Sequence, residues 1–260
     1  MDLRGRVAVV TGGAGHIGRA VSAALAELGA SVCVLDLDAD QCAAAARQLV
    51  ADYETSALPL AIDLSDESQV RGVCDAVLRR FDRLDVLVNC AALVGKSELQ
   101  GWATPFAEQR TPAWRLALEV NLTAPFALAQ SCAVALAASG RGSIINVSSI
   151  YGLVGPDFRL YDGTRLGNPA AYAASKGGLL QLTRWLATAL APRVRVNSLT
   201  PGGVLRGQDA TFQERYVART PLARMATEED FKGAAAYLAS DLSAYVTGQN
   251  LVVDGGWTAW

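Results

Sequence analysis

The sequence predicts a single α/β domain, in which a doubly wound parallel sheet of about seven strands carries helices on both faces. Three observations support this prediction. Apolar β-branched runs alternate with alanine-rich helical stretches, and runs such as VAVV and VLVN are apolar throughout, as in strands buried on both sides. No linker, low-complexity tract or repeat divides the 260 residues, so we treat residues 1–260 as one domain.

The expected elements follow from the period of the apolar residues. Strands are predicted, in chain order, over residues 6–12, 31–36, 57–65, 84–92, 142–149, 194–202 and 249–257. Helices are predicted over residues 17–29, 67–81, 112–138 and 169–191, the first of them closed by Gly29. A loop and small helices are expected between the last two strands.

Composition and charge exclude several function classes. The formal net charge of −2 and the pI of about 5.5 give no indication of a nucleic-acid surface. No apolar run approaches the roughly 18 residues of a membrane span, and the chain enters a strand without a secretory segment, so we expect a cytoplasmic protein without a membrane partner. Five scattered cysteines, never spaced as CxxC, indicate reduced thiols. His16 is the only histidine, which excludes a Ser/His triad and a histidine metal cluster; no metal is predicted.

The segment TGGAGHIG joins the first predicted strand to the first helix. Gly13, Gly15 and Gly18 satisfy the pattern GxGxxG, and Asp36 lies 18 residues after Gly18, at the end of the next strand. Backbone N–H groups at such a turn cradle a pyrophosphate, and the carboxylate accepts hydrogen bonds from ribose hydroxyls. This context indicates a Rossmann-type dinucleotide site; the alternative is a tight turn with an exposed aspartate. Asp36 would repel a 2′-phosphate and is followed by Leu37, so NAD is predicted over NADP.

Three tyrosines lie between residues 148 and 176, and only one of them has a basic partner on a predicted helix. Lys176 follows Tyr172 by four residues, so the two side chains share a helix face. An ammonium group near a phenol lowers its pKa from about 10 toward the range of a working base. Tyr161 has Arg165 at the same offset, but YDGTR is a poor helix, and Tyr151 has no such partner.

The glycine turn, VNCAA, VNLTA, NVSS and YAASK occur here in one order. This combination resembles the short-chain dehydrogenase/reductase family in its short single-domain branch, over essentially the whole chain. The resemblance implies an NAD(H)-dependent oxidoreductase that interconverts a secondary alcohol and a ketone. Tyr172 would be the general acid/base, and Lys176 would lower its pKa and bond the nicotinamide ribose. Ser149 would hold the reacting oxygen, and Asn121 would hold a water that connects the lysine to solvent.

Two of these assignments have alternatives. Ser148 is adjacent to Ser149, and the family places the catalytic serine second in such a pair. Judged without the family, Ser149 could equally cap the end of a strand, and Asn121 could bend a helix or bond the backbone.

The resemblance also implies the cofactor contacts. They are Gly12, Gly15, His16, Ile17, Gly18, Asp36, Leu37, Asp63, Leu64, Asn89, Ala91, Tyr172, Lys176, Pro201, Gly202 and Val204. Asp63 would meet the adenine amino group, Val120 would pack nearby, and the backbone of Val204 would bind the carboxamide. His16 and Arg206 replace the family's usual glycine and threonine. His16 would touch a phosphate or point to solvent, and Arg206 would bind the pyrophosphate or an anionic substrate.

The interval from Ser149 to Tyr172 is 23 residues (172 − 149), longer than the family's usual gap. It implies a loop over the site, and substrate loops are predicted at about 93–112, 151–169 and 203–225. The candidate substrate residues are Tyr151, Arg159, Tyr161, Arg165 and Arg206; the alternative is that the loop arginines are merely solvated. The loops are similar to those of members associated with bacterial surface-sugar and flagellin-glycan modification. This implies carbohydrate metabolism and a hydroxylated sugar, polyol or sugar derivative as substrate.

Two alternative functions stay open: a non-catalytic NAD(H)-binding sensor of the same fold, and a sugar-nucleotide epimerase or dehydratase. The second generally has an extra substrate domain, for which 260 residues leave no room. The segments APFALAQSCAVALAA and YAASKGGLLQLTRWLATALA are apolar on nearly all sides. The family resemblance implies a homotetramer that packs them together, with Trp257 and Trp260 as candidate subunit anchors.

Overall fold

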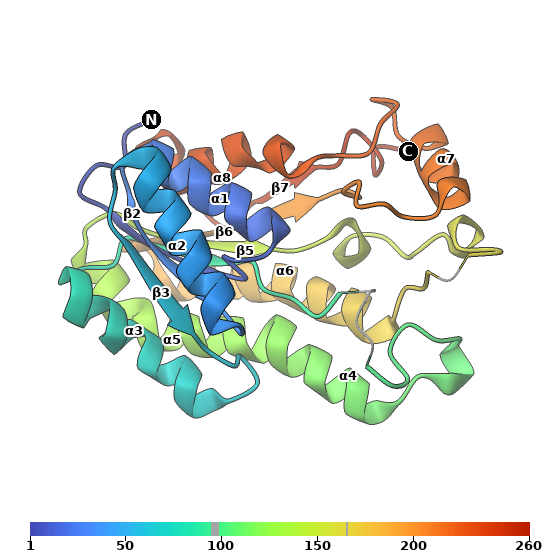
Figure 1. The fold of residues 1–260 in the computed structure, drawn as a ribbon, viewed down its shortest axis with the longest axis horizontal. Coiled ribbons are helices and arrows are strands. Elements are labelled where there is room, and N and C mark those ends of the chain that lie inside the picture. Colours follow the sequence, from blue (N-terminus) through green and yellow to red (C-terminus); the bar gives the residue numbers. More distant parts are fainter. Residues whose placement is uncertain (95–98, 165) are drawn as a thin grey trace.

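The strands form one parallel sheet, which confirms the predicted fold class (Figure 1). The computed structural model describes residues 1–94, 99–164 and 166–260, and within them the sheet has seven strands in the order β3-β2-β1-β4-β5-β6-β7. The strands are β1 (Val7–Thr11), β2 (Ser31–Asp36), β3 (Ala57–Ala61), β4 (Val86–Asn89), β5 (Gly142–Val147), β6 (Val194–Pro201) and β7 (Asn250–Val253). Strands are added on one side of β1 as far as β3 and on its other side from β4 onward, so the winding of the sheet changes sense between β1 and β4. Ligands of such sheets bind at this point, beyond the carboxyl ends of the strands.

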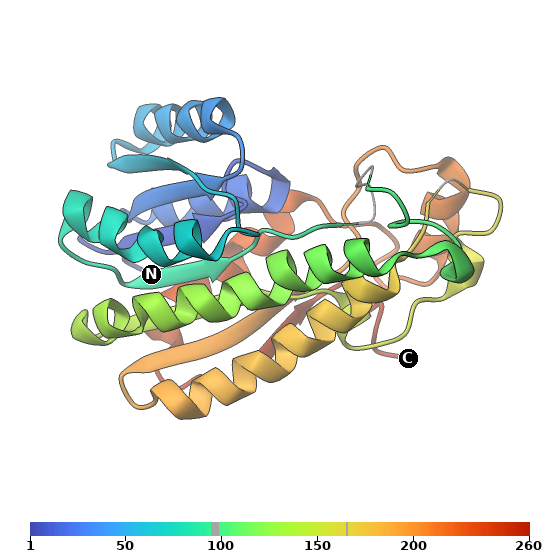
Figure 2. The ribbon, with the colours of Figure 1, turned by 90° about the horizontal axis from the view of Figure 1, so that it is seen from below.

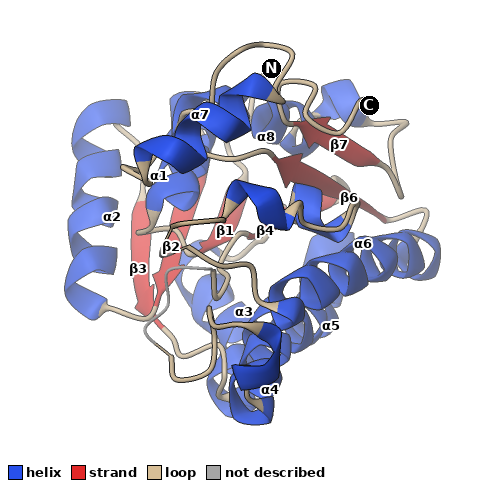
Figure 3. Ribbon diagram, turned by 90° about the vertical axis from the view of Figure 1, so that its right-hand side faces the viewer, coloured by secondary structure: helices blue, strands red, loops and turns tan. Residues whose placement is uncertain are grey.

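Helices cover both faces of the sheet (Figure 3). They are α1 (His16–Glu27), α2 (Ala39–Tyr53), α3 (Glu67–Phe81), α4 (Thr111–Leu118), α5 (Ala124–Ala138), α6 (Ala170–Leu190), α7 (Ala210–Ala218) and α8 (Lys232–Ala239). One buried apolar cluster joins the sheet to α1, α2 and α8, and a second joins it to α3, α5 and α6. The central strands β1 and β4 are buried along their whole length, as their apolar runs predict.

Aspartate caps explain where α2 and α3 begin. The Asp38 carboxylate accepts hydrogen bonds from the backbone N–H groups of Asp40 and Gln41. Asp66 does the same for Ser68 and Gln69. These caps satisfy donors that the first helical turn leaves unpaired. The helix predicted over residues 67–81 is confirmed, whereas α2 was not among the predicted helices.

The helix predicted over residues 112–138 is interrupted. A π-helical turn at Glu119–Thr123 separates α4 from α5, and it contains the fully buried Asn121. The long segment runs beside α6 (Figure 2). One described helical run, Thr111–Ala138, is long and apolar enough by composition to cross a membrane, contrary to the sequence-based expectation, and 44% of its apolar window is buried. The core helices of soluble proteins pass the same test, so this finding is weak evidence for a membrane span.

The segments that follow β4, β5 and β6 gather beyond the carboxyl edge of the sheet, at the right of Figure 1. A small aromatic cluster holds two of them together: Ile150 and Leu160 pack against Phe212 and Tyr216 of α7. Trp257 belongs to the same cluster and is only 4% exposed, so the prediction that it anchors a subunit contact is wrong. Trp260 is 77% exposed.

Candidate active site

The glycine turn after β1 needs its glycines because other backbone approaches it closely. Gly12 has a φ of +64°, and a Cβ atom there would lie 2.9 Å from Cα of Ala91. A Cβ atom on Gly18 would overlap the carbonyl oxygen of Gly12. The hydroxyl of Thr11 accepts hydrogen bonds of 3.0 Å from the N–H groups of Cys90 and Ala91. The turn after β1 is therefore fixed directly against the end of β4.

A cavity of about 510 Å³ lies over this turn, and its lining fits a dinucleotide. The N-cap of α1, Gly15, makes no side-chain cap hydrogen bond, so N–H groups of the first turn are left for a ligand. At the other side of the turn, Asp36 accepts hydrogen bonds from Ala14 N (3.1 Å) and Leu37 N (2.8 Å). These bonds hold the Asp36 carboxylate at the rim of the cavity. A glycine cradle, an open helix end and an acidic residue are the parts of a dinucleotide-binding site.

Most of the residues predicted to contact the cofactor line this cavity. Those that do are Gly12, Gly15, His16, Ile17, Gly18, Asp36, Leu37, Asp63, Leu64 and Ala91, together with Val120. Asn89 is not among the described lining residues: it is 2% exposed, and its amide donates to Asn146 Oδ1 at 2.8 Å. Pro201, Gly202 and Val204 line an adjoining cavity instead, together with Tyr172 and Lys176. Leu116, which the sequence analysis did not identify, also lines the larger cavity.

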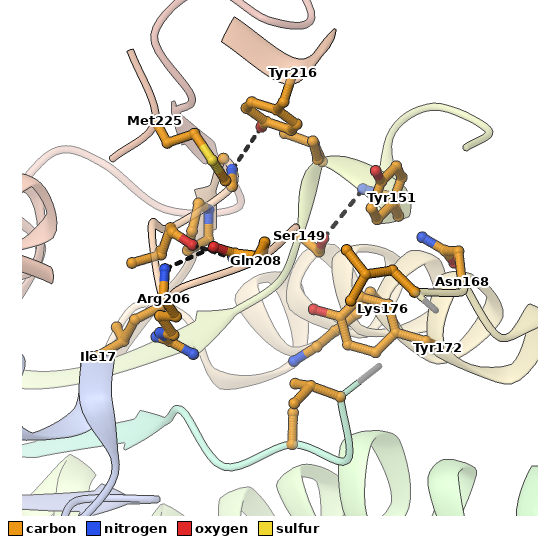
Figure 4. Close-up of a pocket in the computed structure, with 18 of the residues that line it drawn as sticks. Ile17, Ser149, Tyr151, Asn168, Tyr172, Lys176, Arg206, Gln208, Tyr216 and Met225 are labelled. Atoms are coloured by element: carbon orange, nitrogen blue, oxygen red, sulfur yellow. Dashed lines mark hydrogen bonds between the residues drawn. The ribbon is translucent and has the colours of Figure 1, made fainter. Parts of the chain in front are cut away.

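Three of the four catalytic candidates, Ser149, Tyr172 and Lys176, line the adjoining cavity, which has a volume of about 270 Å³ (Figure 4). Tyr172 and Lys176 come from the first two turns of α6, and Ser149 follows the end of β5. Lys176 is 2% exposed, and its Nζ donates to the carbonyl oxygen of Val147 at 2.7 Å. Its Nζ lies 6.0 Å from the centre of the Tyr172 ring. Tyr172 and Lys176 of α6 thus lie in the same cavity as Ser149, which follows β5.

The two neighbouring serines have different surroundings. The Ser148 hydroxyl donates to the backbone carbonyl of Lys176 at 3.0 Å and so ties β5 to α6. The Ser149 hydroxyl accepts from Tyr151 N at 3.2 Å, and Ser149 lines the same cavity as Tyr172. The choice of Ser149 as the catalytic serine stays a prediction. Its hydroxyl also caps the 3₁₀ turn Ile150–Gly152, so the capping alternative describes part of its role.

The environment shifts the pKa values of both α6 residues. Burial raises the pKa of Tyr172, while the nearby Ser149 hydroxyl and the charge of Arg206 lower it; the net shift is upward. This is opposite to the predicted direction, because Lys176 is bonded to Val147 and burial outweighs the favourable charges. Burial also lowers the pKa of Lys176 to about 8.

Asn121 lies within the π-helical turn and contacts α6, the helix that carries Tyr172 and Lys176. Its Oδ1 accepts from Leu93 N at 2.8 Å, and its Nδ2 donates to Leu93 O and to Ser175 Oγ. Ser175 is the neighbour of Lys176 on α6. The Asn121 side chain therefore joins the loop after β4 to the catalytic helix.

Comparisons with known proteins give one consistent result. Residues 12–258 match a family model described as enoyl-(acyl carrier protein) reductase. The chain is 37% identical to cis-4-hydroxycyclohexanecarboxylate dehydrogenase of Sinomonas cyclohexanicum, over 98% of this chain and 97% of that protein. It is 33% identical to D-threitol dehydrogenase of Mycolicibacterium smegmatis, over 98% and 94% of the two chains. A short-chain type dehydrogenase/reductase from Mycobacterium marinum has a similar crystal structure, with a TM-score of 0.87 and 31% identity over 100% of this chain and 97% of that one.

The chain belongs to the short-chain dehydrogenase/reductase family. It is accordingly an oxidoreductase of the alcohol dehydrogenase kind.

In this short-chain dehydrogenase/reductase, the substrate candidates divide by position. Tyr151, Tyr161 and Arg206 line the smaller cavity with Tyr172. Arg159 is not among its described lining residues; its side chain is 82% exposed and pairs with Asp157. Arg165 lies outside the described residues.

Arg206 lines both cavities, at the place where they adjoin. Its Nε donates to Glu228 Oε1 at 3.0 Å, and His16 Nδ1 lies 3.5 Å from the same oxygen. The His16 side chain is 66% exposed at the rim of the larger cavity. These contacts link the glycine turn to the segment after β6.

Several lining residues of the smaller cavity were missed by sequence reasoning. They are Gln208, Phe212, Tyr216 and Met225. Phe212 and Tyr216 are four apart on α7, so they share one helix face, but that spacing alone is also typical of any amphipathic helix. Tyr216 accepts a hydrogen bond of 2.6 Å from Gly203 N and stacks on Trp257 with ring centres 5.7 Å apart.

Proposed function

We propose that this protein is an NAD(H)-dependent dehydrogenase that interconverts a secondary alcohol and a ketone on a hydroxylated sugar, polyol or sugar derivative. The observation that carries the proposal is that Ser149, Tyr172 and Lys176 line one cavity, which adjoins the glycine-turn cavity. A hydroxyl pair so placed can hold and protonate one substrate oxygen.

The proposed cofactor is held by the glycine turn and the open end of α1, with Asp36 at the adenosine ribose. When bound, its nicotinamide ring accepts or supplies the hydride. Asp36 favours NAD, because a carboxylate at this position repels a 2′-phosphate and accepts bonds from free ribose hydroxyls. Leu37 beside it is 69% exposed and offers no charge to a phosphate.

The chain's own residues handle the proton. Because burial raises the pKa of Tyr172, its hydroxyl is protonated at neutral pH, the form that donates a proton to a ketone oxygen. In the oxidative direction Tyr172 must first lose its proton, and its phenolate oxygen then takes the proton from the alcohol. Ser149 holds the substrate oxygen, and the Lys176 ammonium stabilises the phenolate that forms when Tyr172 gives up its proton. Asn121 keeps α6 in register with the loop after β4; its role in a water relay to Lys176 is part of the proposal.

The size and lining of the smaller cavity support a small hydroxylated substrate. A volume of about 270 Å³ suits a molecule of sugar size. Two relatives are named for a hydroxylated cyclohexane acid and for threitol, a four-carbon polyol. Both names describe compact molecules that carry a secondary alcohol and further polar oxygens.

We also propose that the protein is cytoplasmic and forms a homotetramer. The assembly is supported by exposed apolar side chains on two helices: Val134 of α5 is 82% exposed and Trp185 of α6 is 59% exposed. Exposed large apolar side chains on adjacent helices are typical of subunit interfaces. Sedimentation velocity tests this part, and a stable monomer would contradict it.

The experiment that tests the function is a panel of polyols, sugars and sugar acids with NAD, monitored by NADH absorbance, with simple steroids and aliphatic alcohols as the comparison set. We expect turnover with members of the first group. Turnover confined to the second group would contradict the substrate class. Tight NADH binding without turnover of any alcohol or ketone would favour the non-catalytic sensor.

A further inference from the structure

A chain of three polar side chains lies on the wall of the smaller cavity, beside Tyr172. The hydroxyls of Tyr151 and Tyr161 lie 2.7 Å apart, and Asn168 Nδ2 donates to the Tyr161 hydroxyl at 3.4 Å. All three residues line the cavity that also contains Tyr172 and Ser149. In Figure 4, Tyr151 and Asn168 lie on one side of Tyr172, and Arg206 lies on the other.

The hydrogen-bonding capacity of this trio is only partly used. Two tyrosine hydroxyls carry two protons, and the bond between them uses one. Whichever tyrosine is the donor, the second proton has no acceptor among the hydrogen bonds of the described residues. Asn168 is 8% exposed, and its Oδ1 is buried without a partner in the described part of the chain. In the structure the amide nitrogen faces Tyr161, and the open groups are those of this orientation; with the amide turned over, its oxygen would accept the second tyrosine proton and its NH2 group would be the unpaired end.

Buried polar groups in folded proteins are nearly always hydrogen-bonded, and an unpaired one destabilises the fold. Here an open donor and an open acceptor lie in one trio at a cavity wall. A hydroxyl group both donates and accepts, so it satisfies both. A carboxylate only accepts and would leave the Asn168 oxygen unpaired.

The trio is rigidly supported relative to the catalytic tyrosine. Asn168 directly precedes Pro169, the N-cap of α6, and Tyr172 lies in the first turn of that helix. The Tyr161 ring packs on Phe212 with centres 5.4 Å apart, and the Tyr151 ring packs edge-on against Trp257 at 6.3 Å. Such support lets a bound group be positioned against the reacting carbon.

We propose that Tyr151, Tyr161 and Asn168 form a subsite for a second hydroxyl group of the substrate. The inference rests on the proposed alcohol dehydrogenase function and specifies its substrate as a diol or polyol. In the Michaelis complex the second hydroxyl accepts the unused tyrosine proton, and it donates to the Asn168 oxygen once a shift of this side chain uncovers that oxygen. Substrates that lack this hydroxyl leave both groups unpaired.

The test compares cyclohexanol with the 1,2-, 1,3- and 1,4-cyclohexanediols, which move one added hydroxyl around an otherwise constant ring. We expect the wild type to oxidise at least one diol with a kcat/KM about tenfold or more above that of cyclohexanol. Tyr161→Phe and Asn168→Leu each reduce this preference about tenfold, chiefly through KM, while their kcat/KM for cyclohexanol changes little. Asn168→Asp keeps the acceptor and preserves more of the preference than Asn168→Leu.

Tyr216→Phe is the matched control, because it removes a tyrosine hydroxyl from the same cavity but outside the trio. It should change both alcohols by the same factor. Equal losses for diol and cyclohexanol in the trio variants, or a wild type without preference for any diol, would overturn the subsite and leave the proposed function intact. A second readout needs no turnover: calorimetry with Tyr172→Phe in the presence of NAD should give tighter binding of the preferred diol than of cyclohexanol. Equal affinities there would also overturn the subsite, whereas absence of turnover with every alcohol in the wild type would contradict the function itself.

Discussion

Lys176 Nζ donates a hydrogen bond of 2.7 Å to the carbonyl oxygen of Val147, two residues before Ser149. The lysine is thereby bound to the end of β5, and its charge is enclosed in the protein: the residue is 2% exposed. A buried ammonium costs stability unless its partners offset the lost hydration. The buried ammonium of Lys176 therefore affects the free energy of unfolding, which can be measured.

Because of Lys176, the free energy of unfolding should change with pH in the alkaline range. Burial lowers its pKa from 10.5 to about 8, so the unfolded chain binds a proton more tightly than the folded one. The resulting destabilisation is fully present below pH 8 and disappears as pH rises from 8 to 10.5. Lys176→Met removes it, so the stability of the wild type relative to this variant should rise by about 3 kcal/mol between pH 7 and pH 10.5. Urea unfolding of both proteins without cofactor measures this difference, and a constant difference across the range would contradict the buried charge.

Ser148 and Ser149 should respond differently to the same substitution. Ser148→Ala removes the bond to Lys176 O and should lower the free energy of unfolding by about 1 kcal/mol with a small effect on turnover. Ser149→Ala removes the hydroxyl beside Tyr172 and should lower kcat by about 100-fold with a smaller effect on stability. Urea titrations of both variants measure the change in stability, and initial rates measure the change in kcat. The reverse pattern would assign the catalytic role to Ser148.

Gly18 should tolerate no side chain. In Gly18→Ala the new methyl group overlaps Gly12 O, so the turn must move and we expect a loss of about 3 kcal/mol or more, with weakened NADH binding. Gly72→Ala is the control, because that glycine lies in α3 with no atom within 4 Å of its added Cβ. It should stabilise the protein by about 0.5–1 kcal/mol. Thermal unfolding and NADH fluorescence titration measure both effects, and a neutral Gly18→Ala would show that the turn is not so tightly packed.

The cofactor preference should depend on Asp36. Asp36→Ala with Leu37→Arg removes the repelling carboxylate and adds a cation for the 2′-phosphate. The ratio of kcat/KM for NADP to that for NAD should rise about 100-fold, equivalent to about 2.7 kcal/mol. Asp36→Asn separates the contribution of charge from that of shape. Wild-type preference for NADP would show that Asp36 does not set the choice.

The sequence allowed most of the scaffold to be predicted, because its signals are local. Apolar runs and aspartate caps mark the strands and the start of α3, and the glycine turn depends on backbone geometry that only glycine permits. Tyr172 and Lys176 are four residues apart on a helix, so their proximity follows from helix geometry alone. The π-helical turn around Asn121 has no comparable local signal, because the segment stays helical on both sides of it.

The parts that escaped prediction depend on contacts between distant segments. Tyr216 and Met225 reach the cavity only because α7 packs over the loop after β5. Arg159 is an exception: it pairs with Asp157, two residues earlier, and is otherwise solvated, as the alternative for the loop arginines proposed. The upward pKa shift of Tyr172 depends on burial of the phenol, and Lys176 is hydrogen-bonded to Val147. The spacing YxxxK predicts neither of these contacts.

The central claim is that Tyr172 is the general acid/base of an alcohol dehydrogenase. The most direct measurement is the steady-state rate of Tyr172→Phe with a substrate that the wild type oxidises, together with its NADH affinity by fluorescence titration. If Tyr172 is the general acid/base, the kcat of Tyr172→Phe should fall by about two orders of magnitude or more, while its Kd for NADH stays within about twofold. Near-normal turnover by Tyr172→Phe would contradict it.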